Sequence, residues 1–204
     1  MVRNLWEVTH VNIVNDLLEG SMPNERVCPW WLSYTFDNPL RRLIQKPEKI
    51  LGGLVQQGQT VLDIGCGMGF FSLGMARMVG EKGRVISVDL QKKMLETLAR
   101  RAERAGLSSR IHVHQCQTGR IGISEQVDFA LSFWMVHEVP DKKAFLTEVL
   151  SLLKPGAHYL LVEPKMHVTA SAFQRTVEIA CATGMKPCSE PTISLSRSVL
   201  FLPS

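Results

Sequence analysis

Short apolar runs alternate with longer amphipathic runs along the chain from residue 60 onward. Each short run is bounded by turn or polar residues, which is the pattern of buried parallel strands. The short runs predict strands at Thr60–Ile64, Arg84–Val88, Arg110–His114, Phe129–Phe133 and His158–Glu163. The longer runs have helical periodicity and predict helices at Phe70–Val79, Lys92–Ala105, Lys142–Leu153 and Ser171–Thr183. Six alternations of this kind predict an α/β fold with a doubly wound, mostly parallel sheet.

The two ends of the chain depart from this alternation. Two late strands are predicted after Gly184 and Pro191, and the stretch between them is too short for a crossover helix. We therefore expect an antiparallel C-terminal hairpin, which brings the sheet to seven strands. Residues 1–46 are aromatic and punctuated by proline, which predicts a short N-terminal cap or lid segment. Residues 47–204 form the predicted main domain, which opens with a helix from Pro47 toward Val55.

Composition favours one soluble, folded domain. The chain has 204 residues, of which 45% are hydrophobic and 21% charged, as in ordinary globular proteins. A net charge of +4, spread along the chain, gives little support to nucleic acid binding. The five cysteines form no CxxC pair, and we find neither a signal peptide nor a run long enough to cross a bilayer. We therefore expect reduced thiols and a cytoplasmic location. The sequence gives no indication of oligomeric state.

A glycine-rich loop follows the first predicted strand. Asp63 ends that strand, and Gly65, Gly67 and Gly69 then allow a tight turn that a ligand can approach without meeting a Cβ atom. The amides of the following helix point into the same space. An acid at Asp63 is not needed to hold a negatively charged pyrophosphate, and it suits a cationic ligand. Asp89 ends the next strand, where its carboxylate can accept hydrogen bonds from two ribose hydroxyls.

These features resemble the class I S-adenosylmethionine-dependent methyltransferases, which have a Rossmann-like sheet, and in particular their small-molecule, UbiE-like type. The resemblance covers roughly residues 47–202 and is carried by the motif Val61–Gly69 together with Asp89. It implies S-adenosylmethionine as cofactor and a small-molecule methyl acceptor, whose O, N, C or S nucleophile stays open. The cofactor-binding residues that it implies are Asp63, Gly65, Cys66, Gly67, Asp89, Leu90, Gln117, Thr118 and Phe133.

The resemblance also implies a role for several of these residues. Gly65 and Gly67 would line the methionine part of the cofactor, Leu90 would pack on the adenine, and the carbonyl of Phe133 would face the methionine amino group. Cys66 would fill the small space inside the glycine turn. Such enzymes usually have an acid after the third strand to hold the adenine amino group, whereas this chain has Gln117 there. The amide oxygen of glutamine can still accept a hydrogen bond from that amine.

Candidate catalytic residues follow the fourth and fifth strands, because ligands of open α/β sheets bind beyond the carboxyl ends of strands. His137 suits proton abstraction near neutral pH, and Glu163 or His167 can assist it. His137, Glu138, Glu163 and His167 are also metal-ligand types, but their spacing matches no metal motif, so we expect no metal. Tyr34, Phe36 and Trp134 are candidate substrate or lid residues, since aromatic faces attract cations.

Other functions remain open at this point. A nicotinamide-dependent oxidoreductase is disfavoured, because it should show GxGxxG directly after the first strand with no acid before it. A cofactor-binding partner protein without turnover stays an alternative, since fold does not establish function. Arsenite methylation would require Cys28, Cys181 and Cys188 to converge. Methylation of nucleic acid bases is disfavoured, because Phe133-Trp134-Met135-Val136 carries neither an NPPY-like element nor a nucleophilic cysteine.

Overall fold

One sheet of seven strands runs through residues 45–204, which are the residues that the computed structural model describes. The strand order is β3-β2-β1-β4-β5-β7-β6. Strands from β3 to β5 are parallel to their neighbours, whereas β7 runs antiparallel to both β5 and β6. The strands are β1 (Thr60–Ile64), β2 (Arg84–Asp89), β3 (Ile111–Gln115), β4 (Val127–Phe133), β5 (Leu153–Pro164), β6 (Met185–Ser189) and β7 (Ser196–Pro203).

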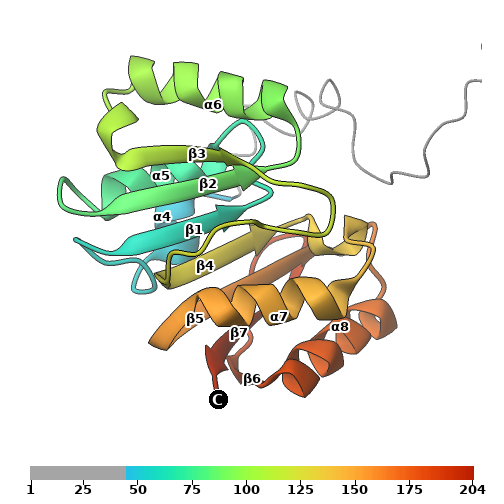
Figure 1. The fold of residues 1–204 in the computed structure, drawn as a ribbon. Helices are drawn as coiled ribbons and strands as arrows, with labels where there is room; N and C mark the ends of the chain where they lie inside the picture. Colours follow the sequence, from blue (N-terminus) through green and yellow to red (C-terminus); the bar gives the residue numbers. More distant parts are fainter. Residues whose placement is uncertain (1–44) are drawn as a thin grey trace, which may run out of the picture.

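Helices cover both faces of this sheet (Figure 1). Two separate apolar clusters show the layers: helices α4, α5 and α6 pack on one face, and helices α7 and α8 pack on the other. The predicted doubly wound, mostly parallel sheet with an antiparallel C-terminal hairpin is therefore confirmed. The helices are α4 (Pro47–Leu51), α5 (Phe70–Met78), α6 (Lys92–Arg104), α7 (Lys142–Leu152) and α8 (Ala170–Thr183), with short 3-10 turns η1 (Ser108–Arg110) and η2 (Val136–Glu138).

The third predicted strand, Arg110–His114, was expected to be buried, and this expectation is wrong. No helix was predicted between the third and fourth strands, and residues 116–126 contain none. Strand β3 lies at the edge of the sheet and is not the buried strand that its apolar pattern predicted. Its central residue, Val113, is 45% exposed. An edge strand lacks a neighbour on one side, and here it also lacks a covering helix on one face.

The start of β5 is a second correction. The fifth strand was predicted at His158–Glu163, but β5 already begins at Leu153, directly after α7, and includes Lys154-Pro155-Gly156. Leu153 pairs with Val127, and the register of β4 and β5 shifts before Phe129. Gly156 has φ +77°, a left-handed conformation that bends the strand where this irregularity lies. The first helix is also shorter than expected, because α4 ends at Leu51.

Residues 1–44 lie outside the described part of the chain, and the predicted lid residues Tyr34 and Phe36 lie there with them. The described chain begins at Gln45, whose buried side-chain amide donates to the carbonyl of Ser194 at 3.2 Å. No helix among residues 45–204 is long and apolar enough to cross a bilayer.

Gly69 sets the distance between α5 and α6. It stands at the N-cap of α5 with φ +84°, and a Cβ atom there would come within 2.1 Å of Leu98 Cδ1 on α6. Glycine is required at this position for two reasons: other residues are strained in this backbone conformation, and no space exists for a side chain.

Replacing Gly69 with alanine is expected to lower the free energy of unfolding by about 2–4 kcal/mol, from left-handed strain and overpacking together. Urea unfolding measures this change. Gly106 is the control: it has φ +67°, but a Cβ atom there would meet nothing within 4 Å, so Gly106→Ala should lose about 1–2 kcal/mol from strain alone. Equal losses in the two variants would show that α6 yields to the added methyl group.

Candidate cofactor site and active site

The candidate site lies along the carboxyl-terminal ends of the parallel strands. Strand β1 has β2 on one side and β4 on the other, so the connections leave it in opposite directions. Crevices at such switch points are where open α/β sheets bind ligands. The loops after β1, β2, β4 and β5 meet at this edge, and they carry the residues singled out in the sequence.

The glycine loop after β1 is anchored to β2 by its backbone. The amides of Gly65 and Cys66 both donate to the carbonyl of Val88, at 2.8 and 3.0 Å. Gly65 and Gly67 have φ values of +69° and +53°, which explains the need for glycine at both. A Cβ on Gly67 would meet nothing within 4 Å, so this residue borders open space that a ligand can fill. A Cβ on Gly65 would instead lie 2.8 Å from Met135 Cγ.

Two backbone amides fix the side chain of Asp89 at the end of β2. Its Oδ2 accepts a 2.8 Å hydrogen bond from the amide of Gly67, and its Oδ1 accepts a 2.9 Å bond from the amide of Gln91. Burial raises the pKa of Asp89, while hydrogen bonds from the amides of Gln91, Gly67 and Leu90 oppose that rise. These bonds fix the orientation of the carboxyl group, and each oxygen keeps further acceptor capacity for a ligand hydroxyl.

Asp63 lies beneath the glycine loop and is almost fully buried. Its Oδ2 accepts a 2.5 Å hydrogen bond from Ser72 Oγ on α5, and Ser72 Oγ accepts in turn from Ser87 Oγ at 2.9 Å. Burial raises the pKa of the Cys66 thiol well above its usual value, and the charges of Asp63 and Asp89 raise it further. The same negative potential that disfavours a thiolate favours a cationic ligand at this loop.

The predicted adenine side of the site is open. Leu90 is half-buried after Asp89, and its carbonyl accepts from the side-chain amide of Gln115 at 3.2 Å. Gln117 and Thr118 are exposed, and the backbone of Gln117 exchanges two hydrogen bonds with that of Arg120 in a tight turn. Leu90 and Gln115 lie next to Asp89, whereas the roles assigned to Gln117 and Thr118 stay predictions.

The residues present suit S-adenosylmethionine. The cofactor has a vicinal ribose diol, a cationic sulfonium and an ammonium group. Asp89 supplies an oriented acceptor for the diol, Gly67 leaves space for close approach, and the buried acid Asp63 contributes negative charge under the loop. A negative charge at this position would repel a pyrophosphate.

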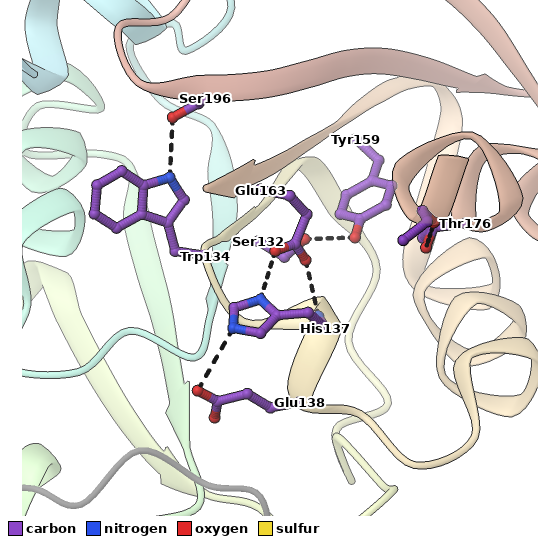
Figure 2. Close-up of polar contacts among 9 residues, drawn as sticks. Ser132, Trp134, His137, Glu138, Tyr159, Glu163, Thr176 and Ser196 are labelled. Carbon is purple, nitrogen blue, oxygen red and sulfur yellow. Dashed lines mark hydrogen bonds and ion pairs between the residues drawn. The ribbon is translucent and has the colours of Figure 1, made fainter. Parts of the chain in front are cut away.

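His137 and Glu163 form a close pair across the ends of β4 and β5. Figure 2 shows the two side chains pointing toward one another: His137 Nδ1 lies 2.6 Å from Glu163 Oε2. Glu163 Oε1 also accepts a 2.9 Å bond from the backbone amide of His137. Glu163 is only 2% exposed, whereas the His137 side chain is 27% exposed. The carboxylate therefore fixes the imidazole from behind and leaves Nε2 toward the surface.

Two further residues border the exposed side of His137. Glu138 Oε1 lies 3.9 Å from His137 Nε2. The ring of His167, which follows β5, stacks on that of His137 with centroids 6.2 Å apart and an interplanar angle of 6°. The structure therefore brings together all three predicted catalytic residues, His137, Glu163 and His167.

Trp134 turns the chain between β4 and this pair. It has φ +61°, a rare conformation for a bulky residue. In Figure 2 its indole points away from His137, and its Nε1 donates to Ser196 Oγ at 2.9 Å. The ring of the preceding Phe133 packs in the core, 4.3 Å from that of Phe71, so only the backbone of Phe133 is placed to face a ligand. Contacts of Trp134 or Phe133 with a ligand stay predictions.

Burial lowers the pKa of His137, but hydrogen bonding and charge from Glu163, with a contribution from Glu138, outweigh that effect and raise the pKa above 6.5. A base works in its neutral form, so the rate is expected to rise with pH through this raised pKa. In Glu163→Gln the rise should move to lower pH, because the charge that stabilises imidazolium is lost. A kcat-against-pH profile measures the shift.

Glu138→Gln is the control for that profile. Glu138 acts on His137 by charge alone, across 3.9 Å, so its removal should shift the profile in the same direction but by less. A profile that is unchanged in Glu163→Gln would exclude His137 as the titrating base.

Metal and arsenite are the other ligand chemistries that the sequence raised. Within residues 45–204 no group of three or more His, Cys, Asp or Glu side chains is arranged to hold a metal ion. Cys181 and Cys188 are exposed on α8 and β6, and Cys28 lies outside the described residues, so the arsenite alternative stays a prediction.

Two residues that contact the candidate cofactor site were not predicted from the sequence. Gln91 orients Asp89 through its amide, and an Asp just before a predicted helix is a recognisable signal for such a turn, because its side chain can accept from the amide two residues on. Met135 packs on Gly65, and no sequence signal identifies that contact.

Comparisons with known proteins agree with this geometry. A family model described as a methyltransferase domain matches residues 56–193. The ubiquinone/menaquinone biosynthesis C-methyltransferase UbiE of Vibrio vulnificus is 28% identical over 153 residues, which are 74% of this chain and 52% of that protein. A protein-L-isoaspartate O-methyltransferase of Thermotoga maritima is 38% identical over 89 residues, 43% of this chain and 27% of that protein.

Among solved structures, a SAM dependent methyltransferase from Aquifex aeolicus is similar with a TM-score of 0.79 and 24% identity, over 87% of this chain and 100% of that chain. Its likeness supports the fold. This chain spans about half the length of the UbiE-type relatives that it matches.

A parallel sheet with a glycine loop and a strand-end carboxylate at its switch point defines an α/β protein that binds a ribose-containing cofactor. The family match is more specific: the chain belongs to the methyltransferase-domain family. The predicted family is thereby confirmed.

Proposed function

We propose that this chain transfers the methyl group of S-adenosylmethionine to a small-molecule acceptor, and that His137 removes the acceptor's proton. One observation carries the proposal: the His137–Glu163 pair lies at the same sheet edge as the glycine loop and Asp89. Relatives named as C-methyltransferases and as an O-methyltransferase support methyl transfer but not one acceptor atom.

The bound cofactor would supply a methyl group on a positively charged sulfur, and the sulfur would keep the electron pair of the broken C–S bond. The chain's own residues must align the acceptor and hold its proton. Glu163 occupies Nδ1 of His137, so the proton is taken at Nε2. Glu163 then stabilises the imidazolium that forms, in the way that a buried carboxylate supports a catalytic histidine. A hydroxyl or an acidic C–H group is the acceptor that benefits from such a base.

Methyl transfer from labelled cofactor to a panel of small molecules tests the proposal. The panel should contain phenols, alcohols and acidic C–H compounds. Labelled product from at least one of them, with production reduced in His137→Ala, is the expected result. Cofactor binding without transfer to any acceptor would instead favour a partner protein that kept the fold without turnover.

Location and acceptor class belong to the same proposal. The four cysteines in the described part of the chain, Cys66, Cys116, Cys181 and Cys188, are free thiols, which supports a reducing compartment such as the cytoplasm.

A small molecule is favoured over nucleic acid as the acceptor because the net charge of +4 is modest.

A further inference from the structure

The loop after β3 carries the residues predicted to hold the adenine, and it has little regular structure of its own. Residues 116–126 form one isolated bridge, between Gln117 and Arg120, and no helix. Gly119 and Gly122 have φ values of +77° and +76°, so the chain turns sharply at both. In Figure 1 the loop runs from the end of β3 past α7 to the start of β4. Its position therefore depends on bonds to other elements.

The start of this loop is fixed at the cofactor end of β2. The amide of Cys116 donates to the carbonyl of Asp89 at 3.1 Å. Gln117 comes next, and its backbone exchanges hydrogen bonds of 3.2 and 3.0 Å with that of Arg120. The orientation of the Gln117 side chain therefore depends on how the far side of this turn is held.

The far side of the turn is held by Glu148, a half-buried residue of α7. Its two carboxylate oxygens accept from consecutive amides: Oε2 from Ile121 at 2.9 Å and Oε1 from Gly122 at 2.8 Å. Hydrogen bonds from amides to a charged carboxylate are stronger than those between neutral groups. Helix α7 is itself firmly placed, because Phe145 and Val149 are buried in the apolar cluster on this face of the sheet. Glu148 thus joins the loop to a fixed helix.

Packing alone supports this stretch of the loop weakly. The Ile121 side chain is buried in the same apolar cluster. Beyond it, residues 122–125 border a cavity of about 370 Å³ that β2 and β3 also line. Glu125 pairs with Arg84, but both side chains are partly exposed, and such pairs contribute little. The carboxylate of Glu148 is therefore the polar anchor of this stretch.

We infer that Glu148 is a positioning residue for the adenine of the bound cofactor. It holds Ile121 and Gly122, and the turn that carries Gln117 is thereby fixed at both sides. The amide oxygen of Gln117 can then accept from the adenine amino group without the cost of first ordering the loop. The inference rests on the proposed function, because S-adenosylmethionine must be the ligand. It goes further by assigning adenine selectivity to a residue on a helix behind the site.

Calorimetry with two ligands tests the inference. One ligand is S-adenosylhomocysteine, and the other is its analogue with hydrogen in place of the adenine 6-amino group. The unchanged chain should bind S-adenosylhomocysteine more tightly than the analogue. In Glu148→Ala this preference should shrink about tenfold, the size expected for one lost hydrogen bond. Glu148→Gln keeps one acceptor oxygen for the two amides, so it should lose less of the preference.

Asp128→Asn is the matched control for the loss of a carboxylate that holds the backbone. Asp128 accepts from the amide of Thr60 at 2.8 Å, but it lies at the start of β4, far from the strand ends that carry the cofactor loop. Its preference between the two ligands should equal that of the unchanged chain. Urea unfolding of each variant verifies that it is folded.

Three results would overturn the inference: equal affinity of the unchanged chain for the two ligands, a preference that persists in Glu148→Ala, or an equal loss of preference in Asp128→Asn. If Glu148→Ala weakens both ligands by the same factor, the preference persists, and Glu148 then stabilises the site only in general. Failure of the unchanged chain to bind S-adenosylhomocysteine at all would contradict the proposed function itself, and this inference with it.

Discussion

Replacing Asp89 with alanine is expected to weaken S-adenosylhomocysteine binding by about 100- to 1000-fold, or roughly 3–4 kcal/mol. The variant removes the acceptor for two ribose hydroxyls. It also removes the partner of the Gly67 and Gln91 amides, which hold the glycine loop and the start of α6 in place. Isothermal titration calorimetry measures the loss directly.

Asp128→Ala is the matched control for this prediction. Asp128 also accepts from a backbone amide, that of Thr60 at 2.8 Å, but it lies at the start of β4 and therefore at the opposite edge of the sheet. It pairs with Lys154 as well. Its loss should lower stability and leave ligand affinity unchanged. If Asp89→Ala binds as tightly as the unchanged chain, Asp89 does not hold the ribose.

Replacing His137 with alanine is expected to lower kcat by about 100- to 10,000-fold, the usual contribution of a general base. Cofactor affinity should stay nearly constant, because His137 is held by Glu163 at the end of β5 and not by the glycine loop. Steady-state kinetics with the true acceptor, together with calorimetry, separate the two quantities.

His112→Ala provides the control, since His112 lies exposed on edge strand β3. Its kinetics should match those of the unchanged chain. Near-normal turnover in His137→Ala would leave catalysis to alignment of the acceptor alone, and Glu163 would then be a structural carboxylate that secures the loop after β4.

The fold was predictable because its signals are local. A strand that ends in Asp63 before three glycines, and a second strand that ends in Asp89, define the cofactor edge without long-range information. The exposure of β3 was harder to foresee, since the Ile111–Gln115 stretch carries the apolar pattern of a covered strand. Whether a strand is central or lies at an edge depends on its neighbours, which the local pattern does not contain.

The His137–Glu163 pair was predictable in part. The predicted strands placed His137 after the fourth strand and Glu163 at the end of the fifth, and parallel strands end on the same side of the sheet. Their 2.6 Å contact depends on the left-handed turn at Trp134 and on η2, and neither has a sequence signal. The contact between Met135 and Gly65 could not be predicted either. Glycine leaves room there for the side chain of Met135 from the loop after β4, and only the fold brings the two residues together.

Calorimetry of the full chain with S-adenosylhomocysteine and, separately, with NAD tests the central claim most directly. The geometry of Gly67 and Asp89 predicts binding of S-adenosylhomocysteine with a Kd of about 1 μM or tighter, near −8 kcal/mol. No comparable binding of NAD is expected, because the buried acid Asp63 disfavours a pyrophosphate at the loop. Binding of NAD in place of S-adenosylhomocysteine would contradict the account.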